Sequence, residues 1–149
     1  MRKWHPDLIA ADATITFLFA CNPESPALTH GGYPAAALCK VNSLKDRVAG
    51  LADLTIMLDV GRWESLSEES QSALLDHELH HAEVVRNKVG AIKYDDANRP
   101  KIRLRKHDFQ IGGFHAIASR HKHHALEMHA VECVNLTWKQ MNLFEMEAA

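Results

Sequence analysis

The chain lacks long hydrophobic runs and a strong net charge, and both absences narrow the class of protein. No apolar stretch approaches the roughly 20 residues that a membrane-spanning helix needs. The 149 residues carry a formal net charge of -2, so there is no overall attraction to nucleic acid or to an anionic membrane. With 46% hydrophobic and 24% charged residues, the composition is typical of a globular protein. We expect a single domain over residues 1–149 and no membrane partner.

Cysteine is also scarce. The three cysteines form no CxxC pair: Cys21, Cys39 and Cys133. An odd number of separated cysteines predicts reduced thiols, with metal ligation as the lesser alternative. A secretion signal is not expected either, because Asp7 and Asp12 interrupt the apolar stretch that ends at Cys21. We therefore expect a cytoplasmic protein.

Histidine is abundant, with 11 residues, and the five residues His77–His81 form the pattern HExxH. On a helix, His77 and His81 lie one turn apart on the same face, where two imidazoles can bind one zinc ion. Glu78 lies beside them and can accept a proton from a water on that ion. The pattern points to a zinc-dependent hydrolase, most simply a metallopeptidase that acts on a polypeptide substrate.

The surrounding sequence predicts a helix at this motif. Residues 65–68 (Ser-Leu-Ser-Glu) have the pattern of a capping box, and neither proline nor glycine follows until Gly90. Four residues would form the apolar side of this helix: Leu74, Leu75, Ala82 and Val85. The preceding segment, Asp53–Asp59, alternates like a strand. A buried helix with ordinary histidines is the alternative, but a strand followed by a HExxH helix favours a zincin-like site.

Two histidines do not complete a catalytic zinc site, which usually has three protein ligands and one open position for water. We favour His107 as the third ligand, because a predicted hairpin would return the chain toward the helix. Asp108 beside it could hold the imidazole in one tautomer. The alternatives that remain open are His115, Glu127 and His129. His80 points elsewhere on the helix and is interpreted as a surface or supporting residue.

Periodicity and turn residues predict an α+β organisation. The predicted strands are Thr14–Ala20, Ala35–Val41 and Asp53–Asp59, and a short helix is predicted over His5–Ala11. A hairpin is predicted between Ala91–Tyr94 and Lys101–Arg105. A long C-terminal helix should run from Phe114 to about Phe144, with His121 and His124 on its apolar stripe. These two histidines are interpreted as hydrogen-bonded core residues or as part of a cover over the site, with a second metal site as the alternative.

Two motifs carry a resemblance to a known family: His77-Glu78-x-x-His81 and Lys106-His107-Asp108-Phe109. From about residue 5 to residue 114 the chain resembles the putative phage metallopeptidase family, a small group related to SprT-like zincins. Asp76 before HExxH and a short hairpin are further marks of the resemblance. It implies a compact zincin-like fold with a small mixed sheet packed on the HExxH helix, and a phage or host-cytoplasm setting. It also implies Glu78 as the catalytic base and zinc ligands at His77, His81 and His107.

The chain departs from the family pattern after the His-Asp pair, where the family tends to carry an acidic residue and then an aromatic one. Residues 110–113 (Gln-Ile-Gly-Gly) intervene here before Phe114, and the histidine-rich final helix is particular to this chain. The shape of the substrate cleft therefore cannot be carried over from the family.

In a peptidase, Glu78 would take a proton from zinc-bound water and pass it to the leaving amine. His115 and Tyr94 are candidates to stabilise the oxyanion or to meet the substrate. The strand Asp53–Asp59 is a candidate edge at which an extended substrate could bind. One alternative function is a metal-binding interaction protein whose catalytic site is unused.

A second alternative is a DNA-associated, SprT-like protease. Basic residues cluster on and around one predicted strand: Arg99, Lys101, Arg103, Arg105 and Lys106. A solvated strand face explains this pattern better, because the total charge is negative and no aromatic platform accompanies the cluster. Nucleic acid is therefore an open but not a favoured partner.

Overall fold

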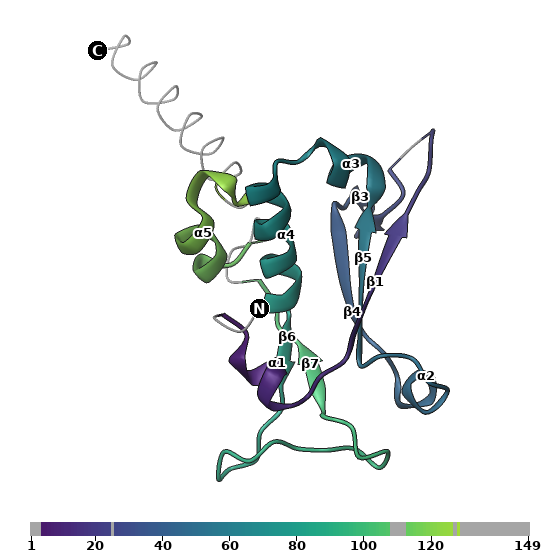
Figure 1. Ribbon diagram of the computed structural model, residues 1–149, viewed down its shortest axis with the longest axis vertical. Coiled ribbons are helices and arrows are strands. Elements are labelled where there is room, and N and C mark those ends of the chain that lie inside the picture. Colours follow the sequence, from purple (N-terminus) through teal and green to yellow (C-terminus); the bar gives the residue numbers. More distant parts are fainter. Residues whose placement is uncertain (1–3, 25, 108–112, 127, 129–149) are drawn as a thin grey trace, which may run out of the picture.

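The computed structural model describes residues 4–24, 26–107, 113–126 and 128. Within them, short helices combine with small sheets, as the sequence predicts for an α+β fold (Figure 1). The helices are Pro6–Ala10 (α1), Leu44–Val48 (α2), Val60–Ser65 (α3), Glu68–His80 (α4) and His115–His121 (α5), with a 3-10 turn at Lys122–His124 (η1). The strands are Ile15–Ala20 (β1), Thr29–His30 (β2), Tyr33–Pro34 (β3), Ala37–Val41 (β4), Leu54–Asp59 (β5), Ala82–Val84 (β6) and Ile102–Leu104 (β7). None of the described helices is long and apolar enough to cross a membrane.

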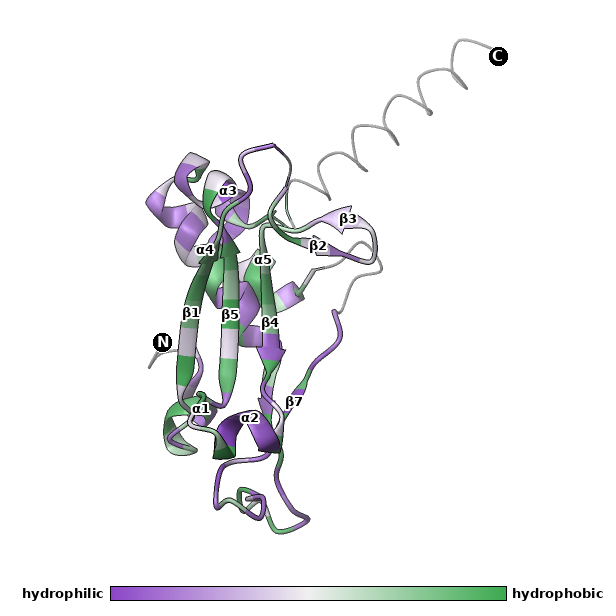
Figure 2. Cartoon of the chain, turned by 90° about the vertical axis from the view of Figure 1, so that its right-hand side faces the viewer, coloured by the Kyte–Doolittle hydropathy of each residue, from purple (hydrophilic) through white to green (hydrophobic). Residues whose placement is uncertain are grey.

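The largest sheet has three strands in the order β1-β5-β4, which lie side by side in Figure 2. β5 is the central strand and pairs in parallel with β1 and antiparallel with β4. The expectation that Asp53–Asp59 forms a substrate-binding edge is therefore wrong. Its nearly continuous run of buried residues is what a strand paired on both sides requires. The edge strand on the side of the HExxH helix is β4.

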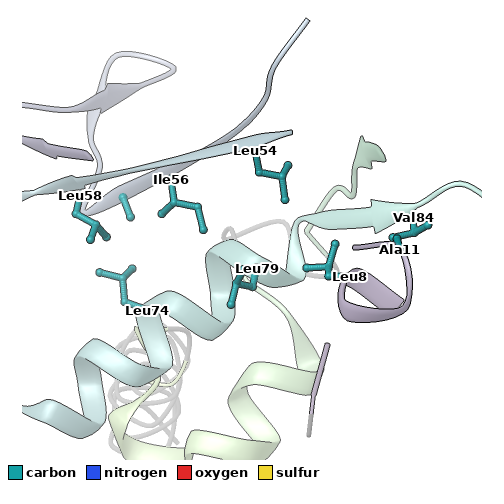
Figure 3. Close-up of a cluster of buried hydrophobic side chains, with 9 residues drawn as sticks. Leu8, Ala11, Leu54, Ile56, Leu58, Leu74, Leu79 and Val84 are labelled. Atoms are coloured by element: carbon teal, nitrogen blue, oxygen red, sulfur yellow. The ribbon is translucent and has the colours of Figure 1, made fainter. Parts of the chain in front are cut away.

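The core lies between this sheet and α4. Leu54, Ile56 and Leu58 alternate onto one face of β5 and are at most 2% exposed. Figure 3 shows this row facing Leu74 and Leu79 of α4. Each such side chain contributes roughly 1.5–3 kcal/mol when buried. Their packing fixes the rotation of α4, and with it the direction in which the HExxH side chains project.

The N-cap of α4 lies two residues after Ser65, the first residue of the predicted capping box. Ser67 is the N-cap, and its hydroxyl accepts a hydrogen bond from the backbone N–H of Ser70 at 3.3 Å. Glu68 and Glu69 occupy the first turn, where negative charge interacts favourably with the helix dipole. Residues 60–65, which lie between the predicted strand and the predicted HExxH helix, form α3, capped by Asp59.

The end of α4 differs more strongly from the sequence-based expectation. The helix ends at His80, and residues 82–84 form strand β6, so Ala82 and Val85 do not belong to its apolar side. β6 pairs antiparallel with β7, with Ala82 opposite Leu104. Valine at 84 and 85 favours this extended conformation. A pairing between segments 20 residues apart in sequence therefore overrides the unbroken helical pattern.

The predicted hairpin exists with a different pairing. Ile102–Leu104 pairs with β6 and not with Ala91–Tyr94. The segment around Ala91–Tyr94 is held instead by bridges between Arg86 and Ile92 and between Tyr94 and Pro100. This difference in pairing does not move His107 away from the candidate site, because the chain still returns to the end of α4 after Leu104.

The predicted helix over 114–144 is not continuous. α5 ends at His121, and Lys122 has a φ of 50°, a left-handed conformation that an α-helix does not allow. Phe114 and Ile117 are fully buried with Ala125 in a small second core. The part of the prediction from 129 to 144 lies outside the described residues. α4 lies between the three-stranded sheet and the short helix α5 (Figure 1).

The buried carboxylate of Asp53, just before β5, binds the segment before β1 and the segment before β7. Asp53 is 1% exposed and accepts hydrogen bonds from the backbone N–H and the hydroxyl of Thr14 at 2.8 and 2.9 Å. Arg99 donates to both of its oxygens, at 3.1 and 2.5 Å. Burial raises the pKa of Asp53, but the hydrogen bonds from Arg99 and Thr14 outweigh it and the pKa is lowered.

Replacing Asp53 by asparagine is expected to lower the free energy of unfolding by about 2–3 kcal/mol, since Arg99 loses its buried partner while keeping some contact with water. The wild-type contribution is complete above the unfolded pKa of 3.8 and is lost as the pH falls through the lowered folded pKa. The difference between the two proteins should thus shrink below about pH 4. Urea unfolding at several pH values measures it. The matched control is Glu83→Gln, whose partner Arg103 is exposed and whose loss should cost less than about 1 kcal/mol.

Candidate metal centre

Two of the candidate ligands project from the last turn of α4. The His77 and His81 rings lie with their centroids 5.1 Å apart, as the four-residue spacing on a helix dictates. His81 is the C-cap residue, with φ -64° and ψ -27°, so it keeps the helical direction although the helix ends there. Both side chains are half-buried.

His107 joins them from the other side. After β7 the backbone N–H of Arg105 donates to the carbonyl of His81 at 2.7 Å, which brings the following residues alongside α4. The His107 Nε2 atom lies 3.2 Å from the Nε2 of His77, and its ring centroid is 4.6 Å from that of His81. One ligand atom from each of the three histidines lies within 4.8 Å of the others. Among the described residues, this is the cluster that could hold a metal ion.

The His81 imidazole is oriented and kept neutral. Its Nδ1–H donates to the carbonyl of Arg105 at 2.9 Å, which leaves the lone pair on Nε2, the state that metal binding needs. Burial lowers the pKa of His81 to about 4, against the effect of that hydrogen bond, and the neighbouring His77 and His107 lower it further. Burial and the nearby Arg105 likewise lower the pKa of His80 to about 4. Both rings are therefore neutral at pH 7.

An aromatic ring lies beneath the whole histidine cluster. Phe114 is fully buried, and its ring centroid lies 5.1 Å from His77, 4.8 Å from His81 and 5.0 Å from His107. It also contacts His80, at 4.7 Å. The sequence placed Phe114 on an apolar stripe and gave it no role at the site. Such a contact joins the start of α5 to α4 and to the end of β7, and local sequence patterns do not indicate contacts of this kind.

Glu78 faces a groove between α4 and the edge strand β4. It is 4% exposed, and burial together with the nearby Glu78 charge raises the pKa of Cys39 on β4 to about 12. The groove has a volume of about 850 Å³ and contains the three histidines, Glu78 and the β4 residues from Ala37 to Cys39. A carboxylate and three imidazoles thus line one groove bordered by β4, an edge strand of the three-stranded sheet.

Asp76, the residue before the motif, holds the surrounding elements onto α4. It is 5% exposed and accepts hydrogen bonds from His5 Nε2 at 2.6 Å, Arg120 Nη1 at 2.8 Å and His121 Nε2 at 2.7 Å. Burial raises its pKa, but these three donors outweigh burial and the pKa is strongly lowered. Asp76 therefore connects the N-terminal segment and α5 to the helix that carries the metal-ligand candidates.

The remaining candidates fall into two groups. Tyr94 and His115 are exposed, and neither is among the described residues that line the groove. The structure thus does not bring them to the position of an oxyanion. Three further candidates lie outside the described residues: Asp108, Glu127 and His129. His121 donates a hydrogen bond to Asp76, whereas the His124 ring lies tilted against that of His123, with centroids 4.0 Å apart.

The basic residues around β7 do not form one patch of unpaired charge. Arg99 is engaged with Asp53, and Arg103 donates twice to Glu83, at 2.7 and 3.1 Å. Lys101 is exposed, while Arg105 and Lys106 line the groove. The pairing of Arg99 and Arg103 weakens the basis for a nucleic-acid surface on this strand.

Three histidines that could hold one metal ion, with a buried carboxylate beside them, fit the class of metal-dependent enzymes. The comparison with protein families agrees: the model of the putative phage metallopeptidase family matches residues 2–142. The chain belongs to this family. No curated protein and no solved structure matches it.

Proposed function

We propose that the protein is a zinc metallopeptidase in which His77, His81 and His107 hold the metal ion and Glu78 is the catalytic base. The observation that supports this most directly is the convergence of three imidazoles, two from α4 and one from beyond β7, on one point of a groove. A zincin-like arrangement of sheet and HExxH helix is part of the same proposal.

The donor set fits zinc in number and spacing. Two zinc–nitrogen bonds of about 2.0–2.1 Å at a tetrahedral angle place the nitrogens about 3.3–3.4 Å apart, close to the 3.2 Å between Nε2 of His77 and Nε2 of His107. Three imidazole ligands leave a fourth position open, as catalytic sites do. When bound, zinc would supply the Lewis acidity that makes water nucleophilic near neutral pH and polarises a carbonyl.

The protein's own groups account for substrate placement and proton transfer. The edge of β4 can pair with an extended polypeptide, since β5 occupies only its other side. Glu78 borders the groove beside the histidines and takes a proton from the attacking water, then passes it to the leaving amine. Phe114 and the carbonyl of Arg105 keep the imidazoles in place.

Metal content tests the ligand assignment. Untagged wild-type protein is expected to retain about one zinc per chain by mass spectrometry, and His107→Ala should lose most of it, because two ligands remain. His115→Ala is the matched control: it removes an exposed histidine outside the groove and should keep the zinc. Full retention by His107→Ala, or loss in His115→Ala alone, would remove His107 from the site.

A further inference from the structure

We propose that the groove selects polypeptide segments that carry acidic side chains on both sides of the cleaved bond. This inference rests on the metallopeptidase function proposed above and names the substrate class of that same groove. Three cationic side chains line it, Arg62, Arg105 and Lys106, whereas Glu78 is the carboxylate among its described lining residues. The groove is therefore positively charged although the whole chain has a net charge of -2.

The cations stand at opposite ends of the groove. Arg62 belongs to α3, which leads into the N-terminal end of α4. Arg105 and Lys106 follow β7, which pairs with β6 directly after the C-terminal end of α4. Figure 1 shows α3 and β7 at the two ends of this helix. A polypeptide that crosses the groove past the histidines therefore meets a positive charge before and after the reacting bond.

These charges are available because they lack carboxylate partners in the part of the chain that the structure describes. Every other described arginine forms an ion pair with an aspartate or glutamate: Arg47, Arg86, Arg99, Arg103 and Arg120. The Arg105 guanidinium forms no ion pair with a described carboxylate, and its Nη1 contacts the neutral ring of His80 at 2.9 Å. The two described arginines without an ion-pair partner are thus both in the groove, where an acidic side chain of the substrate could pair with them.

The wall of the groove along β4 is apolar. Ala35, Ala36 and Ala37 line the groove where β4 begins, and Leu38 and Cys39 continue it. This stretch offers no charge that would select a substrate residue. Selection by charge must therefore come from the two ends.

The choice of variants follows from the contacts. Arg105 also holds His81 through its backbone and contacts His80, so replacing it would disturb the metal centre. Arg62 and Lys106 project exposed side chains into the groove and can be changed to glutamine without removing a described ion pair. Lys88→Gln is the matched control, because Lys88 is exposed and lies outside the described groove lining.

The experiment uses a series of quenched fluorescent peptides that differ only in carrying glutamate, glutamine or lysine on either side of a neutral centre. For the zinc-loaded full chain, kcat/KM is expected to rise about tenfold for each glutamate correctly placed. Arg62→Gln should remove the preference on one side and Lys106→Gln on the other, while Lys88→Gln changes neither. The preference should weaken between 20 mM and 500 mM salt because partly exposed charges are screened.

A binding measurement separates failure of this inference from failure of the proposed function. Fluorescence anisotropy of the same peptides with Glu78→Gln reports recognition without turnover. Tighter binding of the acidic peptides, reduced in the Arg62 and Lys106 variants, supports the inference even if no peptide is cleaved, in which case the peptidase proposal fails. Equal cleavage and binding of acidic and neutral peptides overturns the inference while leaving the peptidase intact. Single-stranded DNA that displaces the peptide at lower concentration than the acidic peptide itself also overturns it, in favour of a nucleic-acid ligand.

Discussion

Replacing Glu78 by glutamine is expected to leave the zinc in place and to lower kcat for peptide hydrolysis by about 10²–10⁴-fold, the usual contribution of a positioned general base. The amide keeps the shape of the carboxylate and can still donate and accept hydrogen bonds, but it cannot accept a proton at neutral pH. Because Glu78 is 4% exposed beside the histidines, bulk water cannot easily take over its task. Zinc content and peptide hydrolysis measured on one preparation check both halves of the expectation.

The pKa of Cys39 provides a second readout for the same variant. Part of its increase to about 12 comes from the negative charge of Glu78, so removing that charge should let the thiol titrate at a lower pH. A Glu78→Gln protein with a lowered Cys39 pKa and retained zinc but no hydrolysis shows that the charge was lost and the fold was not. Glu83→Gln, which removes a carboxylate bound to Arg103 outside the groove, should change none of these quantities. An active Glu78→Gln enzyme would remove Glu78 from the mechanism.

The same variant distinguishes a peptidase from a protein that uses its metal site only for binding. If the biological effect of the protein depends on hydrolysis, it should disappear together with peptide cleavage. If the effect persists in a zinc-loaded Glu78→Gln protein, the site acts by binding, and its carboxylate serves no chemical step.

The part of the site that sequence could predict depends on local spacing. His77 and His81 lie on one helical face because four residues make about one turn, and no tertiary information is needed. His107 was predicted from the return of a hairpin, and the chain does return, although β7 pairs with β6 and not with residues 91–94. The reversal of the chain, and not the identity of the paired strand, is what brings His107 beside α4.

What sequence could not predict depends on pairing over long separations. The helical pattern through residues 82–89 is locally sound, yet β6 forms because β7 offers it a partner. The identity of the edge strand likewise depends on the order β1-β5-β4, which alternation of side chains does not reveal. Phe114 and Asp76 belong to the same class, since their roles arise from segments that meet only in the folded chain.

Asp76 is the residue at which stability and the metal centre are expected to be coupled most strongly. Its replacement by asparagine leaves Arg120 without its buried carboxylate partner and exchanges an acceptor of three donors for an amide that accepts through one oxygen. Loss of one member of a buried ion pair lowers the free energy of unfolding by about 3–5 kcal/mol. For a chain of this length, each kcal/mol corresponds to a fall in Tm of about 2–4 °C.

The zinc site should respond as well, because α5 carries Arg120 and His121 and begins directly after Phe114, whose ring supports the histidines. A loosened α5 should weaken zinc binding by about 10–100-fold, as changes next to metal ligands commonly do. Thermal unfolding with and without zinc, together with a competition titration against a chelator, measures both effects. Asp7→Asn is the control: it breaks the exposed pair with Arg86 and should leave Tm and zinc affinity nearly unchanged.

The double variant Asp76→Asn/Arg120→Gln should be less destabilised than the sum of its two single variants, because the second change removes the cation that the first left unpaired. Strict additivity, or a Tm that is unchanged in Asp76→Asn, would mean that Asp76 does not hold α5 to the metal-binding helix.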